Sequence, residues 1–245
     1  MIIEPLNWDT DFFNLKIGKI EILNRKDFKK LNLLDEETAS FDLVYLFSYD
    51  GPISIETLSP YKIDLTDIML TMSMPMKTHK VDHSIEFKTQ LTDIELKECY
   101  HIASQIAEFS RFYKEPLIGP EKTIQLYHKW IDNALNQKFS DGIFVYKKHD
   151  RIIGLHIIKT DEINGHGIFT LTGVDKEFHG LGIGKKLWEN SYSYWQENFK
   201  LSKIKSPFSL NNQGSFNFHL KMGFNNIDSV KYIYHLRKDN YYMTL

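Results

Sequence analysis

Three glycines alternate at the junction of two patterned segments, at Gly180, Gly182 and Gly184. The run before them, 168–172, is apolar and β-branched, which predicts a strand, and apolar residues recur at helical spacing over 184–198. Glycine has no Cβ, so the backbone can turn its amides inward and approach a ligand closely. A helix that begins at such a loop adds unpaired N–H groups and the positive end of its dipole. The junction therefore predicts a binding site for a phosphorylated ligand.

Two familiar phosphate-binding motifs do not fit this junction. A dinucleotide-binding loop needs glycines spaced as G-x-G-x-x-G and an acidic residue about 20 positions later, and neither is present. A P-loop needs Ser or Thr after Gly-Lys, but Lys186 follows Gly184 and Lys185. A glycine-rich helix entry with no ligand remains the alternative.

The rest of the chain supplies the elements that must position this loop. A capping box formed by Thr92 and Glu95 predicts the start of a helix, and a second amphipathic helix fits 121–137. Further expected elements follow in chain order: strands at 142–146, 152–158 and 167–174, the helix at 184–198, a short strand at 203–205, a helix from Asn211 to Met222 closed by Gly223, and a strand around Tyr232. This order predicts an α/β fold with a mixed, largely antiparallel sheet.

The first part of the chain forms a separate block. Strands are expected at 42–47 and 67–74, and the polar residues from 77 to 88 have the composition of a boundary. We therefore expect a smaller α/β domain over residues 1–85 and a larger domain over 86–245.

Composition excludes several classes of protein. The 245 residues carry a formal net charge of -2 and are 42% hydrophobic, so nothing indicates binding to nucleic acid or to an anionic membrane. The single cysteine, Cys99, excludes an internal disulfide framework and suits a cytoplasmic location. His79 and His83 have the spacing of a zinc helix, but no third ligand is evident and no metal is expected.

Residues 174–184 resemble the acyl-CoA pyrophosphate loop of the GNAT (Gcn5-related N-acetyltransferase) superfamily. In that loop a strand ends in Val, and then come Arg or Gln, two residues, Gly, any residue, and Gly or Ala. This sequence departs from the pattern at His179, which occupies the Arg or Gln position. The resemblance implies the GNAT fold and acyl-CoA as a co-substrate. The residues it implies as cofactor contacts are Leu171, Thr172, Gly173, Val174, His179, Gly180, Leu181, Gly182, Ile183, Gly184, Lys185 and Asn212.

Residues 212–224 are similar to the next segment of the superfamily, an Asn-led helix that ends in Gly-Phe. In relatives the Asn, here Asn212, contacts the pantetheine arm, and a Tyr protonates the departing thiolate. His219 stands at the Tyr position, so either an imidazolium supplies the proton or His219 is a helix-surface residue and water or another Tyr supplies it. The resemblance also implies a backbone oxyanion donor at a bulge over 172–174, where Gly173 is the expected bulge residue.

A third resemblance covers 6–13, 110–113 and 127–134, and it is to bacterial dTDP-fucosamine acetyltransferases. Those enzymes N-acylate a nucleotide-linked amino-dideoxysugar, and the subgroup suggests a homodimer. The resemblance implies that Asp67 is the general base, with an ordinary exposed Asp as the alternative. The residues expected to contact the substrate are Arg111, Tyr113, Tyr127 and Asn133, each of which could instead be an ordinary surface or core residue.

These observations predict an N-acyltransferase that moves an acetyl or short hydroxyacyl group from acyl-CoA to a dTDP-linked amino-deoxyhexose by direct attack. The setting would be bacterial surface-glycan synthesis, of lipopolysaccharide O-antigen or capsule. Two alternatives stay open: a GNAT enzyme for a peptide, lysine or aminoglycoside amine, and a non-catalytic CoA-binding protein. The sequence leaves open whether the sugar amine is at C3 or C4, and which acyl group is moved.

Overall fold

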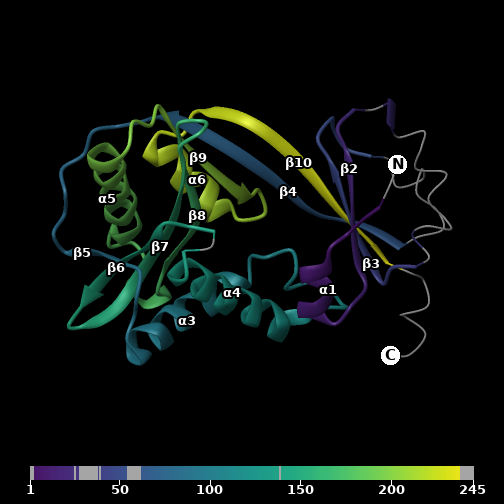
Figure 1. Ribbon diagram of the computed structural model, residues 1–245, viewed down its shortest axis with the longest axis horizontal. Helices are drawn as coiled ribbons and strands as arrows, with labels where there is room; N and C mark the ends of the chain where they lie inside the picture. The colour runs from purple at the N-terminus through teal and green to yellow at the C-terminus, as the bar shows by residue number, and fades with distance from the viewer. Residues whose placement is uncertain are drawn as a thin grey trace. The chain divides into compact units, whose positions relative to one another are not determined.

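The computed structural model describes residues 3–24, 26–27, 38, 40–53, 62–137 and 139–237 (Figure 1). The chain divides into two compact units. Unit 1 comprises Met1–Leu70, Phe208–Gln213 and Asp228–Leu245, and unit 2 comprises Thr71–Pro207 and Gly214–Ile227. Three strands have residues in both units. The predicted domain division at residues 85 and 86 stays a prediction.

Unit 1 is built on strands that pair in the order β1-β2-β3-β10-β4. Its elements are β1 (Glu4–Pro5), α1 (Asn7–Phe13), β2 (Ile17–Ile22), β3 (Leu43–Ser48), the first part of β4 (Lys62–Pro75) and most of β10 (Asn226–Arg237). Strand β2 runs parallel to β3, and β10 runs antiparallel to it. Alternate residues of β2 and β3, such as Ile20 and Leu46, pack with Tyr234 in one buried cluster.

Unit 2 contains the sheet that carries the glycine loop, with strands in the order β4-β9-β8-β7-β6-β5. Its strands are β5 (Ile85–Lys88), β6 (Gly142–Lys148), β7 (Arg151–Asp161), β8 (His166–Val174) and β9 (Lys203–Ser209), the last of which ends in unit 1. Its helices are α3 (Asp93–Ala107), α4 (Gly119–Leu135), α5 (Ile183–Asn198) and α6 (Gln213–Met222). The pairs β5–β6, β6–β7 and β7–β8 are antiparallel, and β8–β9 is parallel. The predicted α/β class with a mixed, largely antiparallel sheet is confirmed.

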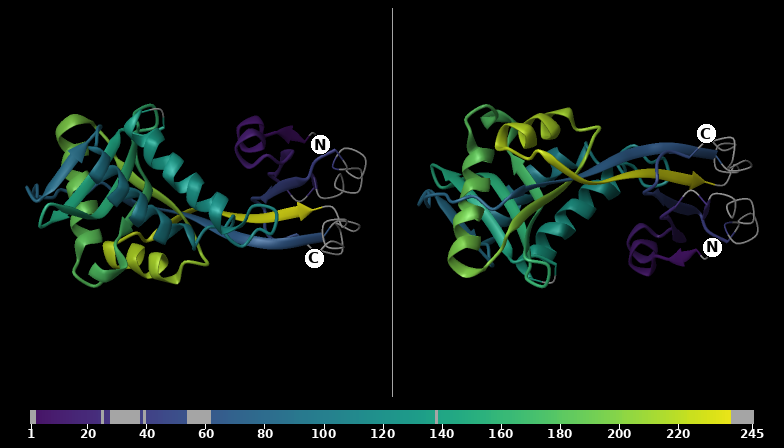
Figure 2. Two further views of the ribbon diagram at one scale, coloured as in Figure 1. Left: turned by 90° about the horizontal axis from the view of Figure 1, so that it is seen from below. Right: turned by 90° about the horizontal axis from the view of Figure 1, so that it is seen from above.

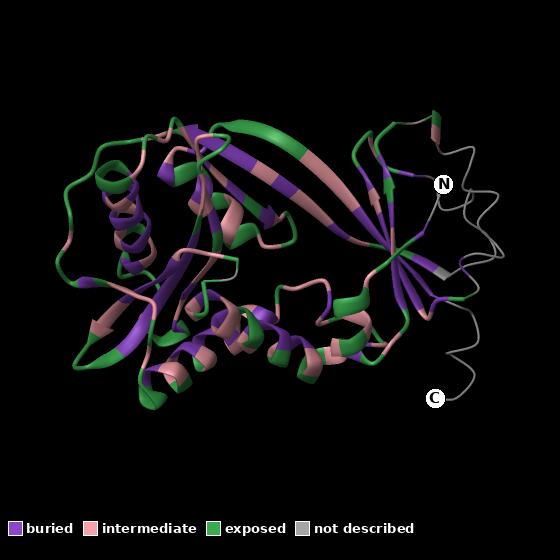
Figure 3. Ribbon diagram, viewed as in Figure 1, coloured by how far each residue is buried: buried purple, intermediate pink, exposed green. Residues whose placement is uncertain are grey.

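The central strand of unit 2, β7, is buried on both faces because helices cover both (Figures 1 and 2). Leu155 and Ile157 face a cluster that includes Cys99 of α3 and Ile131 of α4. Gly154 faces the opposite layer, where a Cβ atom would come within 2.7 Å of Ile183 in α5. Figure 3 shows the buried residues running along these strands and along the inner side of α5.

Local signals in the sequence predicted the helices of unit 2 well. The capping box is confirmed, because Glu95 N–H donates to Thr92 Oγ1 at 3.3 Å and Thr92 N–H donates to Glu95 Oε2 at 2.8 Å. Gly223 follows α6 with φ +96°, as its expected role at the end of that helix requires. None of the described helices is both long enough and apolar enough to cross a membrane.

The segment expected as a boundary contains a strand that its composition did not predict. Residues 85–88 form strand β5, which pairs with β6. Phe87 supplies the missed signal, since its ring stacks on Tyr194 with centroids 4.8 Å apart. Lys88 then binds Glu95 at 2.7 Å, which ties the strand to the start of α3. The segment has a polar composition because the exposed side of this strand is charged, and the strand was therefore not predicted.

Candidate functional site

Strands β8 and β9 separate partway along their length. Their parallel ladder has three pairs, which end at Ile168 and Lys205, although both strands continue. On its other edge β8 stays paired with β7 as far as Val174. Within the described part of unit 2, no strand therefore pairs with the free edge of β8 beyond Ile168. Its backbone N–H and C=O groups can receive an extended ligand as an added strand would be received.

The irregularity in β8 lies at Thr170 and not at Gly173. Leu171 pairs with Ile157 and Phe169 pairs with Ile158, so Thr170 is the extra residue. The expectation that Gly173 is the bulge residue is wrong, because Gly173 pairs regularly with Leu155.

A packing requirement explains the glycine at position 173. A Cβ atom there would lie 2.2 Å from Ile106 Cδ1 and 2.7 Å from Ile102 Cγ2. Both isoleucines belong to α3. The absence of a side chain therefore lets that helix approach β8 closely.

Two glycines of the loop have positive φ, with Gly180 at +82° and Gly182 at +75°. A Cβ atom on either glycine would meet nothing within 4 Å, so lack of space does not explain these glycines. The left-handed backbone conformation, which L side chains disfavour, does explain them. Gly182 is the N-cap of α5 and has no side-chain cap. The first helical bond runs from Lys186 N–H to Gly182 O at 3.1 Å. The amides of residues 183–185 precede it, so they can bind an anion at the positive end of the helix.

A buried carboxylate fixes the start of the loop. Asp175 is only 1% exposed, and its Oδ2 accepts from Arg151 at 2.6 Å. Its Oδ1 accepts from Glu177 N–H at 3.2 Å and from Gln105 Nε2 at 3.4 Å. Gln105 also accepts from Lys176 N–H at 2.9 Å, which connects the loop to α3. Sequence reasoning missed these anchors, because Arg151 and Gln105 lie far from the loop along the chain.

Two polar residues predicted to contact the cofactor, His179 and Lys185, bind other groups of the protein. His179 is exposed, and its Nε2–H donates to Val174 O at 2.8 Å, which closes the loop on itself. Lys185 pairs with Glu189 at 3.5 Å one turn along α5, and its side chain is 62% exposed. The lysine ammonium can therefore swing toward a ligand at little cost, since exposed ion pairs are weak. Contacts from either residue to a phosphate stay predictions.

His219 is buried and both of its ring nitrogens have partners. Its Nδ1 lies 2.7 Å from Ser215 O, and its Nε2 lies 2.7 Å from Ser206 Oγ. A carbonyl only accepts, so Nδ1 carries the proton and Nε2 accepts from the Ser206 hydroxyl. Burial lowers the pKa of His219 to about 4, although the bond to Ser215 O opposes the shift. The ring is therefore neutral near pH 7, which corrects the expectation of an imidazolium as the proton donor. Its burial corrects the alternative that His219 is a helix-surface residue.

Thr172, which is half-buried, is the centre of a second group of hydrogen bonds. Its Oγ1 accepts from Trp188 Nε1 at 2.9 Å and lies 2.9 Å from His156 Nδ1. His156 is fully buried, and burial lowers its pKa to about 3. The Trp188 ring lies between this group and His219, with ring centroids 4.8 Å apart in the latter pair. These contacts fix the position of β8 relative to α5 and α6.

Asp67 lies in unit 1 and is only 4% exposed, so the alternative of an ordinary exposed aspartate is wrong. Its Oδ1 accepts from Ser209 Oγ at 2.5 Å and from Asn211 Nδ2 at 3.3 Å. Asn212 follows in the same unit, and its N–H donates to Ser209 O at 3.1 Å. Neither Ser209 nor Asn211 was expected at the site, and their chain positions gave no signal.

The four residues expected to contact a substrate occupy different environments. Arg111 lies in the turn after α3, with its guanidinium 4.1 Å from the Phe112 ring centroid. Tyr113 and Asn133 are half-buried, and Tyr127 is 7% exposed within the core cluster of α3 and α4. Core packing accounts for Tyr127. The substrate contacts of all four stay predictions.

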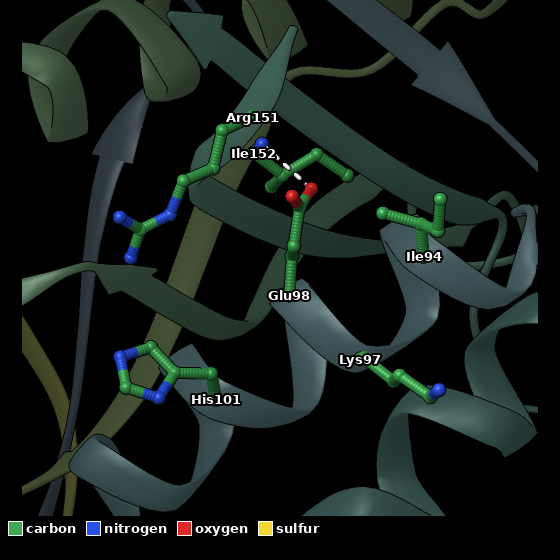
Figure 4. A pocket seen from close by; sticks show the side chains of 6 residues that line it. All are labelled: Ile94, Lys97, Glu98, His101, Arg151 and Ile152. Atoms are coloured by element: carbon green, nitrogen blue, oxygen red, sulfur yellow. Dashed lines mark hydrogen bonds between the residues drawn. The ribbon is translucent and has the colours of Figure 1, made fainter.

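A surface cavity of about 260 Å³ lies between α3 and the start of β7 (Figure 4). It is lined by Ile94, Lys97, Glu98, His101, Arg151 and Ile152. Glu98 accepts from Ile152 N–H at 2.9 Å, which is the bond drawn in the figure. None of the six is among the predicted site residues, but Arg151 also binds Asp175 of the loop.

A sheet split next to a helix entry lined by free amides defines a class of protein that binds an extended, phosphorylated ligand. The family model described as Acetyltransferase (GNAT) family matches residues 102–224, which is half of the chain. The chain therefore belongs to the GNAT acetyltransferase family, whose members use acyl-CoA. This membership supports an acyl-CoA-dependent N-acyltransferase.

Solved structures with the same fold are distant in sequence. A functionally unknown conserved protein from Staphylococcus epidermidis is 14% identical, with a TM-score of 0.59 over 91% of this chain and 84% of that one. A GCN5-related N-acetyltransferase from Sphaerobacter thermophilus is 11% identical, with a TM-score of 0.51 over 89% and 72%. A GCN5-related N-acetyltransferase from Kribbella flavida is 9% identical, with a TM-score of 0.51 over 91% and 81%. At such identities the likeness shows the fold alone. The comparison with curated proteins found no match.

Proposed function

We propose that this protein transfers an acyl group from acyl-CoA to the amine of a dTDP-linked amino-deoxyhexose. The observation that carries the proposal is the split between β8 and β9, which opens beside the amides at the start of α5. The free edge of β8 suits the amides of a pantetheine arm, and the helix entry suits a pyrophosphate. The donor half of the reaction rests on these contacts and on the family.

The acceptor half rests on the sequence resemblance. Segments 6–13, 110–113 and 127–134 resemble enzymes that acylate nucleotide-linked amino sugars. Arg111 offers a planar fork for a phosphate, and Tyr113 and Asn133 offer polar groups for a sugar or base. The product would serve the synthesis of a bacterial surface glycan, and a homodimer in the cytoplasm remains the expected form.

The proposed reaction is direct attack by the sugar amine on the thioester carbonyl. We assign the first deprotonation, from ammonium to amine, to Asp67, whose carboxylate is buried. A backbone N–H on the free edge of β8, within residues 171–174, stabilises the tetrahedral oxyanion. The helix entry holds the pyrophosphate, with Lys185 as a mobile cation. No covalent acyl-enzyme is needed, so steady-state kinetics are sequential.

The test is a screen of amine acceptors with acetyl-CoA as the donor. The release of free CoA thiol measures turnover with each acceptor. The acceptors are dTDP-linked 3-amino and 4-amino-6-deoxygalactose, a peptide N-terminus, a lysine side chain and an aminoglycoside. We expect turnover with one of the two nucleotide sugars and at least about tenfold less with the others. If the protein preferred a peptide, lysine or aminoglycoside amine, that amine would replace the nucleotide sugar as the proposed acceptor. Tight CoA binding by calorimetry with no turnover on any amine would favour a non-catalytic CoA-binding protein.

A matched pair of variants connects turnover to the loop. Gly182→Val places a β-branched residue at a φ of +75°, which L residues avoid. Ile163→Val changes an exposed side chain of the same unit, at a site 97% exposed. The first variant should lose CoA binding and turnover together, and the second should keep both. Equal behaviour of the two variants would contradict the proposed phosphate site.

A further inference from the structure

Two opposite charges face the cavity between α3 and the start of β7 (Figure 4). Glu98 belongs to α3, and Arg151 is the first residue of β7. One oxygen of Glu98 accepts from Ile152 N–H at 2.9 Å, and Arg151 Nη2 donates to Asp175 at 2.6 Å. Within the part of the chain that the structure describes, no ion pair joins Glu98 to Arg151. The second Glu98 oxygen and Arg151 Nη1 also have no hydrogen-bond partner there.

The charged groups around the cavity balance one another. Lys97, Glu98 and Arg151 line it, and the buried Asp175 lies against the guanidinium of Arg151. Glu177 adds a carboxylate 3.9 Å from Arg151 Nη1, but its side chain is 74% exposed, so water screens it. Glu98 would repel a ligand with only a negative charge, and Lys97 and Arg151 would repel one with only a positive charge. The cavity therefore favours a ligand that carries both charges.

Apolar side chains form the rest of the cavity. Ile94 and Ile152 line it, and Ile94 is 71% exposed. Figure 4 shows Arg151 and His101 on one side of Glu98 and Ile94 on the other side. The volume of about 260 Å³ is below the roughly 300–1,000 Å³ of sites for drug-sized ligands. A small molecule with an apolar part therefore fits this cavity.

We propose that the cavity binds a free α-amino acid with an aliphatic side chain. The ligand carboxylate accepts from Arg151 Nη1, and the ligand ammonium donates to the second oxygen of Glu98. The aliphatic side chain packs on Ile94 and leaves water. The acyl acceptor has no part in these contacts, so the inference goes beyond the proposed sugar reaction.

Arg151 connects this cavity to the glycine loop. Its side chain is 45% exposed, and it binds Asp175 at the start of the loop. A ligand carboxylate on Nη1 favours the orientation of the guanidinium in which Nη2 binds Asp175. The bound amino acid therefore stabilises the loop conformation that receives the CoA pyrophosphate. By linkage, bound CoA strengthens the binding of the amino acid by the same factor.

Leucine and three analogues test the three contacts of the ligand. Leucinamide lacks the carboxylate, isocaproate lacks the ammonium, and glycine lacks the apolar side chain. We expect leucine to bind in a ligand-observed NMR titration, and each analogue to bind at least about tenfold more weakly. The proposal fails if leucine does not bind, or if any of the analogues binds as tightly as leucine.

A matched pair of variants tests whether leucine binds at this cavity. Glu98→Gln removes the negative charge, but the amide oxygen still accepts from Ile152 N–H, so the local fold is kept. This variant should bind leucine at least about tenfold more weakly than the wild type and bind CoA alone within about twofold. Glu162→Gln makes the same change at an exposed site in the turn after β7 and should bind leucine normally. Equal leucine affinity in the two variants would mean that leucine binds elsewhere, which contradicts the proposal.

Calorimetry of CoA binding, with and without saturating leucine, measures the coupling. We expect CoA to bind the wild-type protein about threefold more tightly when leucine is present, and Glu98→Gln to show no such change. Unchanged CoA affinity in the leucine-bound wild type would overturn the connection through Arg151. These measurements use no acyl acceptor. A protein that binds leucine but acylates no amine would therefore lose the sugar reaction and keep this site.

Discussion

A histidine in place of a tyrosine changes more than the length of one side chain. The spacing of the Asn-led segment predicted the position of His219, but not its charge, its burial or its partner Ser206. Burial depends on Phe224, at the end of the same segment, and on Trp188, which lies in another part of the chain. Local sequence therefore identified the residue and could not give its protonation state, because desolvation is set by neighbours that spacing does not reveal.

The buried histidines predict acid sensitivity. Burial lowers the pKa of His219 from 6.5 to about 4 and that of His156 from 6.5 to about 3. Because each folded pKa lies below its unfolded value, the unfolded chain binds the proton first. Each contribution is full above about pH 6.5 and is lost as the pH falls toward the folded value. The loss for His219 alone is on the order of 3 kcal/mol.

Urea unfolding at several pH values between 7 and 4.5 measures this dependence. We expect the free energy of unfolding to fall steadily over that range. Glutamine at position 219 does not titrate in this range. The slope of the unfolding free energy against pH should therefore be visibly shallower in His219→Gln than in the wild type. An identical slope in both proteins would show that His219 does not titrate as described.

At the scale of elements, the sequence predicted what neighbouring residues determine. The capping box of Thr92 and Glu95 and the glycine after α6 are decided within one turn of helix, and both are confirmed. Strand β5 and the bulge at Thr170 were missed, because each depends on pairing with a strand elsewhere in the chain. The anchors of the glycine loop were missed for the same reason.

One of those anchors gives a prediction for Arg151. Arg151→Gln removes the cation from Asp175, which is 1% exposed, so the start of the loop loses its charge partner. The arginine side chain is 45% exposed, and water therefore screens part of the loss. We expect destabilisation of about 1–2 kcal/mol and CoA affinity about tenfold weaker. Thermal unfolding and calorimetry measure the two effects.

The control is a second cation of the same loop. Lys176 pairs with Glu108 at 2.9 Å, but the two side chains are 51% and 39% exposed. Lys176→Ala should therefore cost less than about 0.5 kcal/mol. If this variant weakened CoA binding as much as Arg151→Gln, general loss of positive charge would explain both, and the anchoring role of Asp175 would be wrong.

At the scale of the whole molecule, the fold class was predictable and the grouping of its strands was not. The sequence favoured a linear division near residue 85, which stays a prediction. Strand β10 pairs with β3, so residues 232–237 lie beside 43–48. Alternation of apolar residues predicts that a segment is a strand, but it does not say which distant strand it joins.

The single cysteine gives a probe of the whole fold. Cys99 lies on the buried face of α3 and is fully buried, and burial raises the pKa of its thiol to about 12. We expect a thiol reagent at pH 8 to label the native protein at least about a thousandfold more slowly than the protein in denaturant.

Cys99→Ala should keep sequential transfer kinetics, because no step uses the thiol. Rapid labelling of the native protein would contradict its burial. Loss of turnover in a folded Cys99→Ala would indicate an acyl-enzyme instead.

Strand β10 lies between β3 and β4 in the order of unit 1, yet it is the last of the three to be synthesised. While the ribosome is still making the chain, β3 and β4 each have one edge without its final neighbour. Unpaired strand edges recruit other chains, so this interval is when the nascent protein is most exposed to aggregation. A chaperone that shields these edges until β10 has been made should therefore raise the yield of soluble protein.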